Sequence, residues 1–600
     1  MKQEVIIMKK TVTLAISLFA LSAVCASAQT FNPRVEVENI YEGKVVEAGK
    51  NPLGMTVPDS LYKFQYQLDY SVFDNPYQGS YNFRPYRIEM RPDAAASDAR
   101  RLYVNLGAGW TFHPEFDLIW SPVIRNKPFK LSVYDHFRGY LSDYGTMVYD
   151  ELFEIPAKPS RGTAGFVLDN KVGVNTRYEF SKVALEVDAG YRAFASDDTL
   201  SSHFLQLAEA EIRLLPLDPN RADYFYGGRV YVNAGQDRFS SLMSGRHKLG
   251  VNDMGTDLSF GAPVSGRSRV LLDLGLQTIV YSGVLEAVAT RVWATPRYQV
   301  RWLSGSAELG AKISYLKGTD NSKEKISTIL FSQSAYQHPS SLFYPAILVR
   351  QYLVPDHLAL YAKVDGGDCL NGYSDNLRSN PFFDPSIVVS NLDASSERLN
   401  AAAGFAGDVA GKFQFDVHAG YGIRNNWRCD AVEFIEAVDS YSGDAARYLS
   451  SYNMYCDYKR LYADASFLWK SPRLDIDGHF LYQQTDLVKS EYRAVEPARY
   501  SGEFQACYNW NRQAFAGVSV EAASAREGWA ITWVPGVHSE HVWPVKVPGW
   551  IDLGVFGRYV VNPHWTLWVK AGNLLGQSVQ HYFVHPEKGP YATIGFSFNL

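Results

Sequence analysis

The sequence predicts an all-β protein, a transmembrane antiparallel β-barrel of about 22 strands. Apolar and polar residues alternate with a period of two, in segments of about 9–11 residues that suit tilted membrane-crossing strands. The connections between these segments are alternately short and long. Outer-membrane barrels show this pattern, because their periplasmic turns are short and their extracellular loops are long. The last segment ends on an apolar residue, Leu600, as a barrel-closing strand would.

The alternation is clearest in the last segment and recurs in Val183–Tyr191, 460–469 and 503–510. Even-numbered residues from Ile594 to Leu600 are apolar, whereas Thr593, Ser597 and Asn599 lie between them. Strands place successive side chains on opposite faces, which helices do not. We therefore expect odd-numbered positions of Val183–Tyr191 and even-numbered positions of 594–600 to face lipid.

The expected connections fall into two length classes. Long ones are Asp365–Arg398, Asn425–Tyr458 and Arg526–Gly549. The short ones are Asn126–Pro128, Glu179–Lys182, Pro263–Ser268, Leu303–Ser306, Leu353–Asp356, Asp408–Lys412, Lys470–Arg473, Asn511–Gln513 and Val561–His564.

Three regions follow one another along the chain. Residues 1–28 have a basic start, an apolar run and a small-residue end at Ala28, which predicts a signal peptide. Residues 29–101 contain scattered prolines, and we expect a short N-terminal segment in the periplasm or the lumen. Residues 102–600 are expected to form the barrel. A secreted barrel predicts the outer membrane of a Gram-negative cell, after cleavage of the signal peptide.

Composition and motifs exclude several classes of function. A net charge of -5 gives no indication of nucleic-acid binding. The hydrophobic content of 46% excludes a disordered chain. The sequence has no Gly-x-Ser-x-Gly, His-Glu-x-x-His, phosphate-binding Gly-Lys-Ser/Thr or Cys-x-x-Cys motif. We therefore predict that the protein is not an enzyme, and we assign no catalytic residue, metal ligand or cofactor.

Two blocks of sequence resemble the barrels of TonB-dependent receptors. The first block contains Leu342-Phe343-Tyr344-Pro345 and Tyr352-Leu353-Val354-Pro355-Asp356; the second contains Asn573-Leu574-Leu575-Gly576-Gln577 and Gly595-Phe596-Ser597-Phe598. The resemblance implies a barrel of about 22 strands that an N-terminal plug normally fills. Residues 29–101 are too short for a full plug. The resemblance thus implies the barrel and its location, and it does not extend to energised import.

Carboxylate and imidazole side chains are expected on one face of three successive strands. They are Asp416 and His418 on the first strand, Asp464 on the second, and Asp475, Asp477 and His479 on the third. If all six face the lumen, the cluster could bind a cation or select against anions. The alternative, which we favour, is an ordinary wetted wall, because barrel interiors are generally polar.

Four cysteines, Cys369, Cys429, Cys456 and Cys507, remain after signal cleavage, in an oxidising compartment. Cys429 and Cys456 bracket one expected long loop, which a disulfide between them would close. The alternative is that all four are unpaired, since spacing alone does not give the distance that pairing requires.

A barrel of about 22 strands is wide, and its lumen must be closed to prevent leakage. The expected loops Asp365–Arg398 and Asn425–Tyr458 are rich in aromatic residues, including Phe382, Phe383 and Trp427. Such side chains are poor choices for solvated loops unless they pack on something. We expect both loops to occlude the lumen; the alternative is packing above the rim.

We therefore expect the barrel to admit or transport a solute across the outer membrane. The alternative is a non-transporting scaffold or assembly partner for surface or periplasmic proteins. The expected partners are outer-membrane lipid and, for the scaffold, periplasmic or surface proteins. The sequence does not identify the solute.

Overall fold

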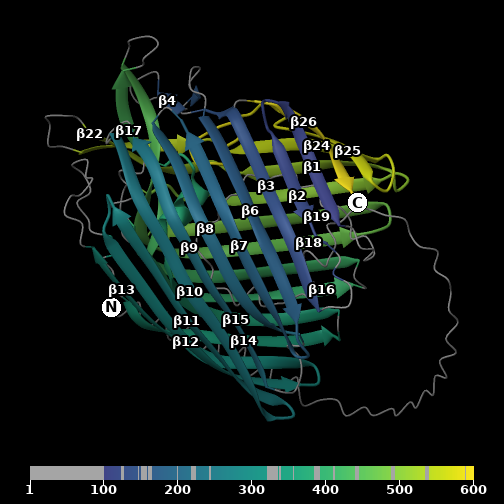
Figure 1. The fold of residues 1–600 in the computed structure, drawn as a ribbon. Helices are drawn as coiled ribbons and strands as arrows, with labels where there is room; N and C mark the ends of the chain where they lie inside the picture. Colours follow the sequence, from purple (N-terminus) through teal and green to yellow (C-terminus); the bar gives the residue numbers. More distant parts are fainter. Residues whose placement is uncertain are drawn as a thin grey trace. The chain divides into compact units, whose positions relative to one another are not determined.

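A computed structural model describes residues 101–600 except 123, 125–127, 146, 150–157, 160–164, 199, 218–223, 242–244, 321–334, 337–339, 356, 384–391, 410–411, 439–444, 488–493, 534–539 and 588. The predicted signal peptide and nearly all of the predicted N-terminal segment lie outside the described residues. Within the described part of the chain, the fold is a closed antiparallel barrel whose wall has 22 strands (Figure 1). The predicted fold class is confirmed.

The wall strands follow one another around the barrel in chain order. They are β1 (Leu102–Trp110), β2 (Glu115–Trp120), β3 (Phe129–Tyr144), β6 (Gly165–Glu179), β7 (Val183–Asp197), β8 (Ser201–Pro216), β9 (Phe225–Ser241), β10 (Gly245–Ser265), β11 (Ser268–Gly283), β12 (Ala287–Trp302), β13 (Gly305–Asp320), β14 (Ser340–Val354), β15 (Leu358–Leu370), β16 (Ala394–Val409), β17 (Phe413–Val438), β18 (Ala445–Lys470), β19 (Leu474–Leu487), β20 (Tyr500–Asn509), β21 (Ala514–Ala523), β24 (Trp550–Val560), β25 (Trp565–Gly572) and β26 (Tyr591–Asn599). Outside the wall lie β4 (Met147–Tyr149), β5 (Lys158–Pro159), helix α2 (Tyr373–Ser379), β22 (Arg526–Trp533) and β23 (Glu540–Val547).

The barrel closes because its first and last strands pair. β1 runs antiparallel to β26, from Tyr103 opposite Asn599 to Trp110 opposite Ala592, and the two strands lie side by side in Figure 1. Closure gives every wall strand two neighbours, so that backbone groups do not meet lipid without a hydrogen-bond partner. Among the described residues, no helix is long and apolar enough to cross a membrane.

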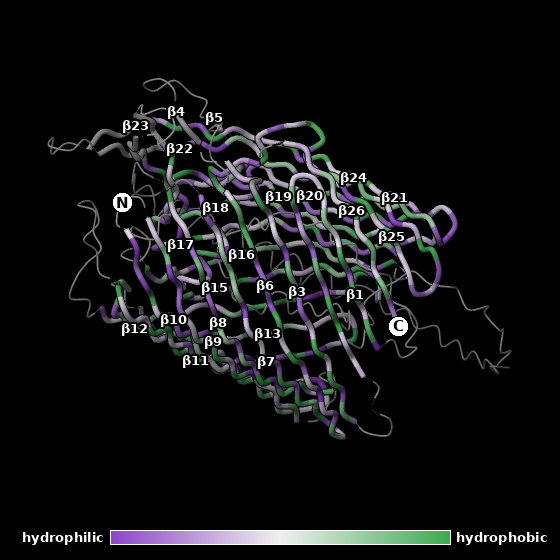
Figure 2. The backbone as a smooth tube through the Cα atoms, turned by 45° about the horizontal axis from the view of Figure 1, so that its top comes forward, coloured by the Kyte–Doolittle hydropathy of each residue, from purple (hydrophilic) through white to green (hydrophobic). Residues whose placement is uncertain are grey.

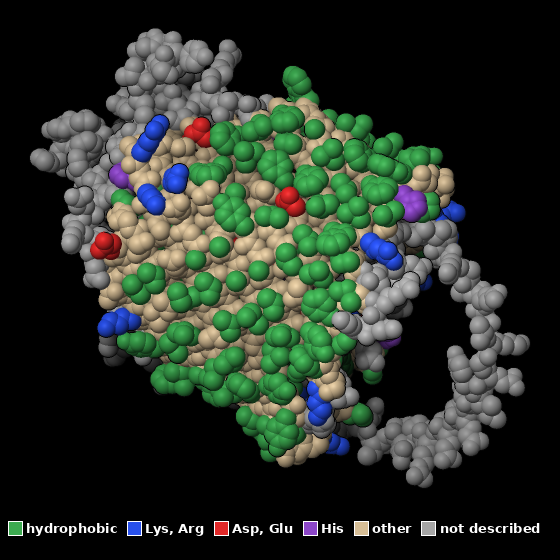
Figure 3. Space-filling view, in the orientation of Figure 1, with side chains coloured by type: hydrophobic (Ala, Val, Ile, Leu, Met, Phe, Trp, Pro, Cys, Tyr) green, Lys and Arg blue, Asp and Glu red, His purple; other side chains and the backbone are tan. Residues whose placement is uncertain are grey.

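The two faces of the wall differ as the alternation predicts. On β26, Ile594 is 68% exposed, whereas Thr593 is 1% exposed and Ser597 5%; Leu600, directly after the strand, is 58% exposed. Figure 2 shows the same alternation of hydrophobic and hydrophilic residues along other strands, and Figure 3 shows many apolar side chains on the outer surface. The apolar residues therefore face outward, toward lipid.

The expected short connections lie at one rim, which we call the short-turn rim; parts of Asn126–Pro128, Leu353–Asp356 and Asp408–Lys412 lie outside the described residues, and Asn126–Pro128 falls within the longer connection 121–128. Most join their strands through two to four residues, as at 303–304 between β12 and β13 and at 471–473 between β18 and β19. Exposed aromatic residues gather beside these turns, including Trp302, Trp469 and Trp565. Aromatic girdles of this kind mark the interface of barrel proteins with a bilayer surface.

The expected loop Asn425–Tyr458 is wrong, because most of it is strand. β17 and β18 remain paired beyond the barrel, from Trp427 opposite Cys456 to Val438 opposite Ala445. β22 adds to β17 in parallel and β4 adds to β18, which makes a small sheet at the opposite, long-loop rim. The region is rich in β-branched and aromatic residues, which favour strands. The sequence reasoning limited strands to the length that crosses a bilayer.

This hairpin also contains the predicted cysteine pair. A disulfide joins Cys429 and Cys456, whose Cα atoms are 6.7 Å apart. The two cysteines are 27 residues apart in the sequence. The disulfide therefore joins the two strands of a paired hairpin, whereas an open loop is expected from the sequence. Cys369 is buried and Cys507 is half-buried, and neither forms a disulfide within the described residues.

Arginine tests the assignment of faces on β6. Val172 is 40% exposed in the middle of this strand, on its lipid face. Asn175 lies on the lumen face, where its amide donates to Asp188 at 3.2 Å. We expect Val172→Arg to cost about 2–4 kcal/mol and to reduce assembly, because lipid does not solvate the charge. Asn175→Arg should assemble normally beside Asp188. Heat-modifiable gel mobility measures both, and equal tolerance would contradict the assigned faces.

Thiol labelling tests the cysteine pair. Without reductant, a maleimide should label Cys507 in detergent-unfolded protein and leave Cys429 and Cys456 unlabelled. Both should become labelled after reduction, and peptide mass spectrometry identifies each site. The Cys429→Ser variant is the control, because it should release Cys456 for labelling without reductant. Labelling of both cysteines in unreduced wild-type protein would exclude the disulfide.

Candidate functional site

Residues 371–383 and 392–393, between β15 and β16, fold into the lumen; we call these described residues the inner loop. It contains α2, which begins after Gly372 and ends at Asn380, whose backbone N–H donates to the Asn376 carbonyl oxygen. Asp375 lies in the first turn and Arg378 in the last, as the helix dipole favours. The described inner-loop aromatics Tyr373, Phe382 and Phe383 are 1% exposed or less. Phe382 and Phe383 therefore point inward, as predicted.

One side of the inner loop is bonded to the wall at β8 and β9. The Tyr373 hydroxyl donates to Asp237 Oδ2 at 2.6 Å, and the same oxygen lies 2.9 Å from His203 Nδ1. His203 Nε2 lies 3.2 Å from the Phe383 carbonyl oxygen, so both ring nitrogens face oxygen acceptors. These side chains are fully or almost fully buried. Buried polar groups that lose such partners cost about 1–3 kcal/mol each, so this contact holds the loop firmly.

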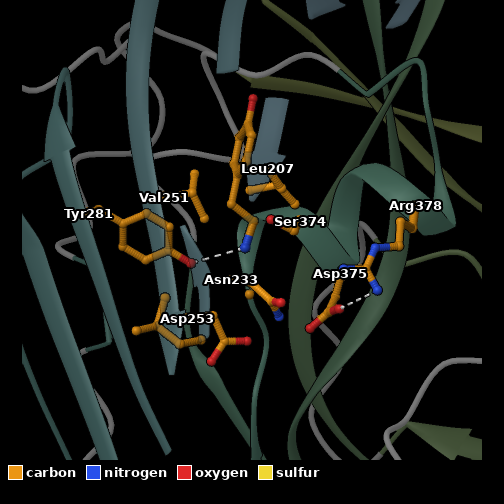
Figure 4. Close-up of a pocket in the computed structure, with 11 residues that line it drawn as sticks. Leu207, Asn233, Val251, Asp253, Tyr281, Ser374, Asp375 and Arg378 are labelled. Carbon is orange, nitrogen blue, oxygen red and sulfur yellow. Dashed lines mark hydrogen bonds and ion pairs between the residues drawn. The ribbon is translucent and has the colours of Figure 1, made fainter. Parts of the chain in front are cut away.

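Two further tyrosines fix the start of α2. The Tyr281 hydroxyl on β11 accepts the Tyr373 backbone N–H at 3.0 Å (Figure 4) and lies 3.1 Å from the Tyr336 hydroxyl. Tyr336 donates to the Asn371 carbonyl oxygen at 3.0 Å. Burial, followed by the neighbouring Tyr281, raises the pKa of Tyr336 well above its usual range. The hydroxyl therefore stays neutral and remains a donor.

The other side of the inner loop is bonded to β17 and β18. The Asn380 amide donates to Ser451 Oγ at 2.5 Å, and the Arg428 guanidinium donates to the Asn376 side-chain oxygen. Around the wall of the described barrel, eight strands separate β8 from β17 in one direction and twelve in the other. The inner loop is therefore held between the lumen wall at β8 and β9 and, on nearly the opposite side, the part of the β17–β18 hairpin beyond the barrel, and it spans the lumen near the long-loop rim.

A second segment, the β25–β26 loop (573–590), packs against the inner loop. The ring centroids of Phe382 and His585 are 4.5 Å apart and the rings are stacked. His585 Nε2 lies 3.0 Å from Asp198 Oδ2, in the β7–β8 connection. Tyr144 at the end of β3 contacts both Phe382 and Tyr582, with centroids 5.3 and 5.2 Å apart. The two loops thus share one aromatic cluster inside the barrel.

A shallow pocket remains between α2 and the wall (Figure 4). Asn233, Asp253 and Tyr281 line it from β9, β10 and β11, and Asp375 and Arg378 line it from the inner loop. Arg378 Nη1 and Asp375 Oδ1 lie 3.8 Å apart, and the two side chains point toward each other in Figure 4. The pocket therefore offers both acidic and basic groups to a solute in the lumen.

The predicted lumen cluster lies on β17, β18 and β19. His418 Nδ1 is 3.0 Å from Asp416 Oδ1, and His479 Nε2 is 3.0 Å from Asp464 Oδ2. Asp475 and Asp477 lie farther along β19, toward the short-turn rim, with Asp475 opposite Lys470. The structure thus brings four of the six residues into two carboxylate–imidazole pairs, and the cation-binding role stays a prediction.

Sequence reasoning missed the anchor of the inner loop. His203, Asp237 and Tyr373 lie on three separate segments, 34 and 136 residues apart. No local motif links them, and their proximity results from the strand order. The sequence offers one weak signal for this anchor: His203 and Asp237 lie at lumen-facing positions of their strands. Other lumen-facing residues of these strands are mostly polar as well, so the signal does not distinguish the two.

The comparisons with known proteins concern the fold. No family model and no curated protein matches the sequence. The structure is similar to "Copper transporter OprC", with 12% identity and a TM-score of 0.57 over 84% of this chain and 80% of that one. The FrpB iron transporter from Neisseria meningitidis (F3-3 variant) matches with 8% identity and a TM-score of 0.58 over 83% and 81%. The siderophore receptor PiuA from Acinetobacter baumannii matches with 10% identity and a TM-score of 0.58 over 84% and 82%.

Identities this low show the fold alone. The 22-strand wall, its short-turn rim and these matches confirm the resemblance that the sequence motifs indicated. The chain has the barrel fold of the TonB-dependent outer-membrane receptors.

Proposed function

We propose that this barrel admits a solute across the outer membrane and that the inner loop is its gate. The observation that carries the proposal is the attachment of this loop on two nearly opposite sides, through Asp237 on the lumen wall and through Ser451 on the β17–β18 hairpin beyond the barrel. These attachments are hydrogen bonds between side chains or to loop backbone, and none is a strand pairing. The loop can therefore leave its place without breaking the closed wall.

The lumen suits a polar or charged solute. Arg177 pairs with Glu186 at 2.6 Å and Arg192 with Asp169 at 2.6 Å on the wall near β6 and β7. Charges of both signs line this wall, as in a water-filled passage. The titles of the similar structures name a copper transporter, an iron transporter and a siderophore receptor. This supports the general role of a transporter and leaves the solute of this chain open.

The length of residues 29–101 fits the same proposal. In barrels of about 22 strands a plug fills the lumen, and the sequence of this segment is short for that task. An inner loop bonded across the lumen would supply part of the closure that a plug gives. We propose that residues 29–101 contribute the remainder as a periplasmic or lumenal segment.

A scaffold is the second candidate function, and the sheet at the long-loop rim favours it. This sheet consists of β5, β4, the ends of β18 and β17 beyond the wall, β22 and β23, and β23 is an edge strand with one described neighbour. Edge strands can pair with a strand of another protein. Conductance discriminates the two functions, because a scaffold should not conduct with or without its inner loop.

Deletion of the gate tests the transport proposal. Replacing residues 373–391 with a short Gly/Ser linker should raise single-channel conductance in a planar bilayer several-fold, while the intact protein conducts weakly. The matched control replaces residues 439–444, the connection of the β17–β18 hairpin, and should leave conductance unchanged. An intact barrel that already conducts as a wide pore would contradict the gate. A deletion variant that stays closed would move the gate elsewhere.

The lumen cluster is tested in the open variant. Asp475→Asn, Asp477→Asn and His479→Gln together remove two negative charges from one wall. The reversal potential in a salt gradient should then shift toward weaker cation selectivity, because the wall attracts cations less. Ser466→Ala on the same wall is the neutral control. An unchanged reversal potential in the triple variant would show an ordinary wetted wall.

A further inference from the structure

Three carboxylates lie side by side on adjacent strands of the wall. Glu503 on β20 is opposite Glu521 on β21, and Glu521 is opposite Asp552 on β24. Glu521 is 6% exposed and Asp552 8%. Like charges directly opposite each other on neighbouring strands are destabilising, and burial increases the cost. This part of the wall therefore needs a positive charge.

The β25–β26 loop brings two more ionisable groups to the same place. His581 is 3% exposed, and its Nε2 lies 3.3 Å from Glu521 Oε2 and 3.7 Å from Asp552 Oδ2. On the other side of the ring, Nδ1 lies 2.6 Å from Glu587 Oε1. The Trp550 ring packs edge-on against His581, with centroids 5.1 Å apart. The His581 imidazole therefore faces the carboxylates of Glu521, Asp552 and Glu587. Even a protonated imidazole carries one positive charge, which does not balance three negative charges.

Both atoms of the contact between His581 and Glu521 are buried without a hydrogen-bond partner among the described residues. They are His581 Nε2 and Glu521 Oε2, whose side chains are only 2% and 7% exposed. The two atoms face each other across 3.3 Å as an ion pair. Nδ1 can donate its proton to Glu587, so that loss of the Nε2 proton on binding of a metal ion would leave a lone pair directed at Glu521 and Asp552. Native proteins rarely bury such groups without a partner or an ion.

The spacing of these atoms suits a small transition-metal ion. Ligands held about 2.0–2.2 Å from a tetrahedral ion lie about 3.3–3.6 Å from one another, close to the two observed distances. A second grouping, in which Glu587 takes the place of Glu521, also has its donor atoms within 4.8 Å of one another: Asp552, His581 and Glu587. Asp552 Oδ1 accepts the backbone N–H of Asn573 at 2.6 Å, which leaves Oδ2 toward His581. A histidine that donates its other N–H to a carboxylate is a common arrangement at metal sites.

We propose that His581 Nε2, Glu521 and Asp552 bind a divalent transition-metal ion, with Glu587 as the positioning residue for the imidazole. The ion would fasten the β25–β26 loop to β21 and β24 inside the lumen. Calcium is excluded as the main occupant, because it prefers six to eight oxygen ligands at longer distances. The site does not depend on the proposed transport function, since its ligands belong to the wall and one loop.

Zinc binding to the purified full-length protein tests the site. After chelation, the wild-type protein should bind one more equivalent of Zn²⁺ than His581→Gln, as measured by calorimetry and elemental analysis. Glu521→Gln and Asp552→Asn should also lose this equivalent, and Glu587→Gln should weaken it about 10–100-fold. His585→Gln is the matched control, because His585 belongs to the same loop but contacts Asp198. It should keep the equivalent.

Cobalt gives a readout that does not depend on stability or transport. Co²⁺ in the wild-type site should show the visible absorption bands of a four-coordinate ion, and these should be absent from His581→Gln. Each variant is first checked for a folded barrel by heat-modifiable mobility. Equal Zn²⁺ stoichiometry in wild-type and His581→Gln proteins would overturn the proposal, as would displacement of Zn²⁺ by equimolar Ca²⁺. Loss of the site in His585→Gln alone would also overturn the assignment of ligands.

Discussion

Lipid offers no hydrogen-bond partner to a polypeptide backbone, and the rest of this structure depends on that constraint. Strands satisfy it only if the sheet closes, which the pairing of β1 with β26 achieves. Closure of a 22-strand wall has a second consequence, because the enclosed lumen is wide. The chain must therefore either leave a pore or fill it from within, and the residues that fill it cannot belong to the wall.

The inner loop meets this need with chemistry unlike that of the wall. Wall strands bond to one another through backbone groups, whereas the loop is held by side chains such as Asp237 and Ser451. Phe382 and Phe383 add apolar burial, worth about 1.5–3 kcal/mol for each fully buried ring. A loop held in this way is stable in place, yet its release leaves the wall intact. The division between a permanent wall and a removable filling underlies the proposed gate.

The wall could be predicted from the sequence because its signals are local. The alternation from Thr593 to Leu600 and the short turns depend on neighbouring residues only, and both are confirmed. The Asn425–Tyr458 hairpin was mistaken for a loop because bilayer thickness, which limits membrane strands, does not limit strands beyond the rim. The hydrogen bond between Tyr373 and Asp237 was missed because the order of the strands brings these two residues together, and no sequence motif links them. The same holds for His581 and Glu521, which the sequence did not mark as metal ligands.

The two lumenal loops are coupled, and this limits how the gate can open. Phe382 of the inner loop stacks on His585 of the β25–β26 loop, and His585 is in turn paired with Asp198. If the β25–β26 loop is fastened to the wall, the inner loop must slide off a fixed aromatic surface. Its departure exposes Asp237 and His203, which are buried and hydrogen-bonded while the gate is closed. Groups of this kind cost about 1–3 kcal/mol each when left without partners. Water or a polar solute can replace the lost contacts, whereas an apolar solute cannot. If the inner loop is the gate, the side chains that hold it closed, Asp237 and His203, therefore also favour the passage of polar solutes.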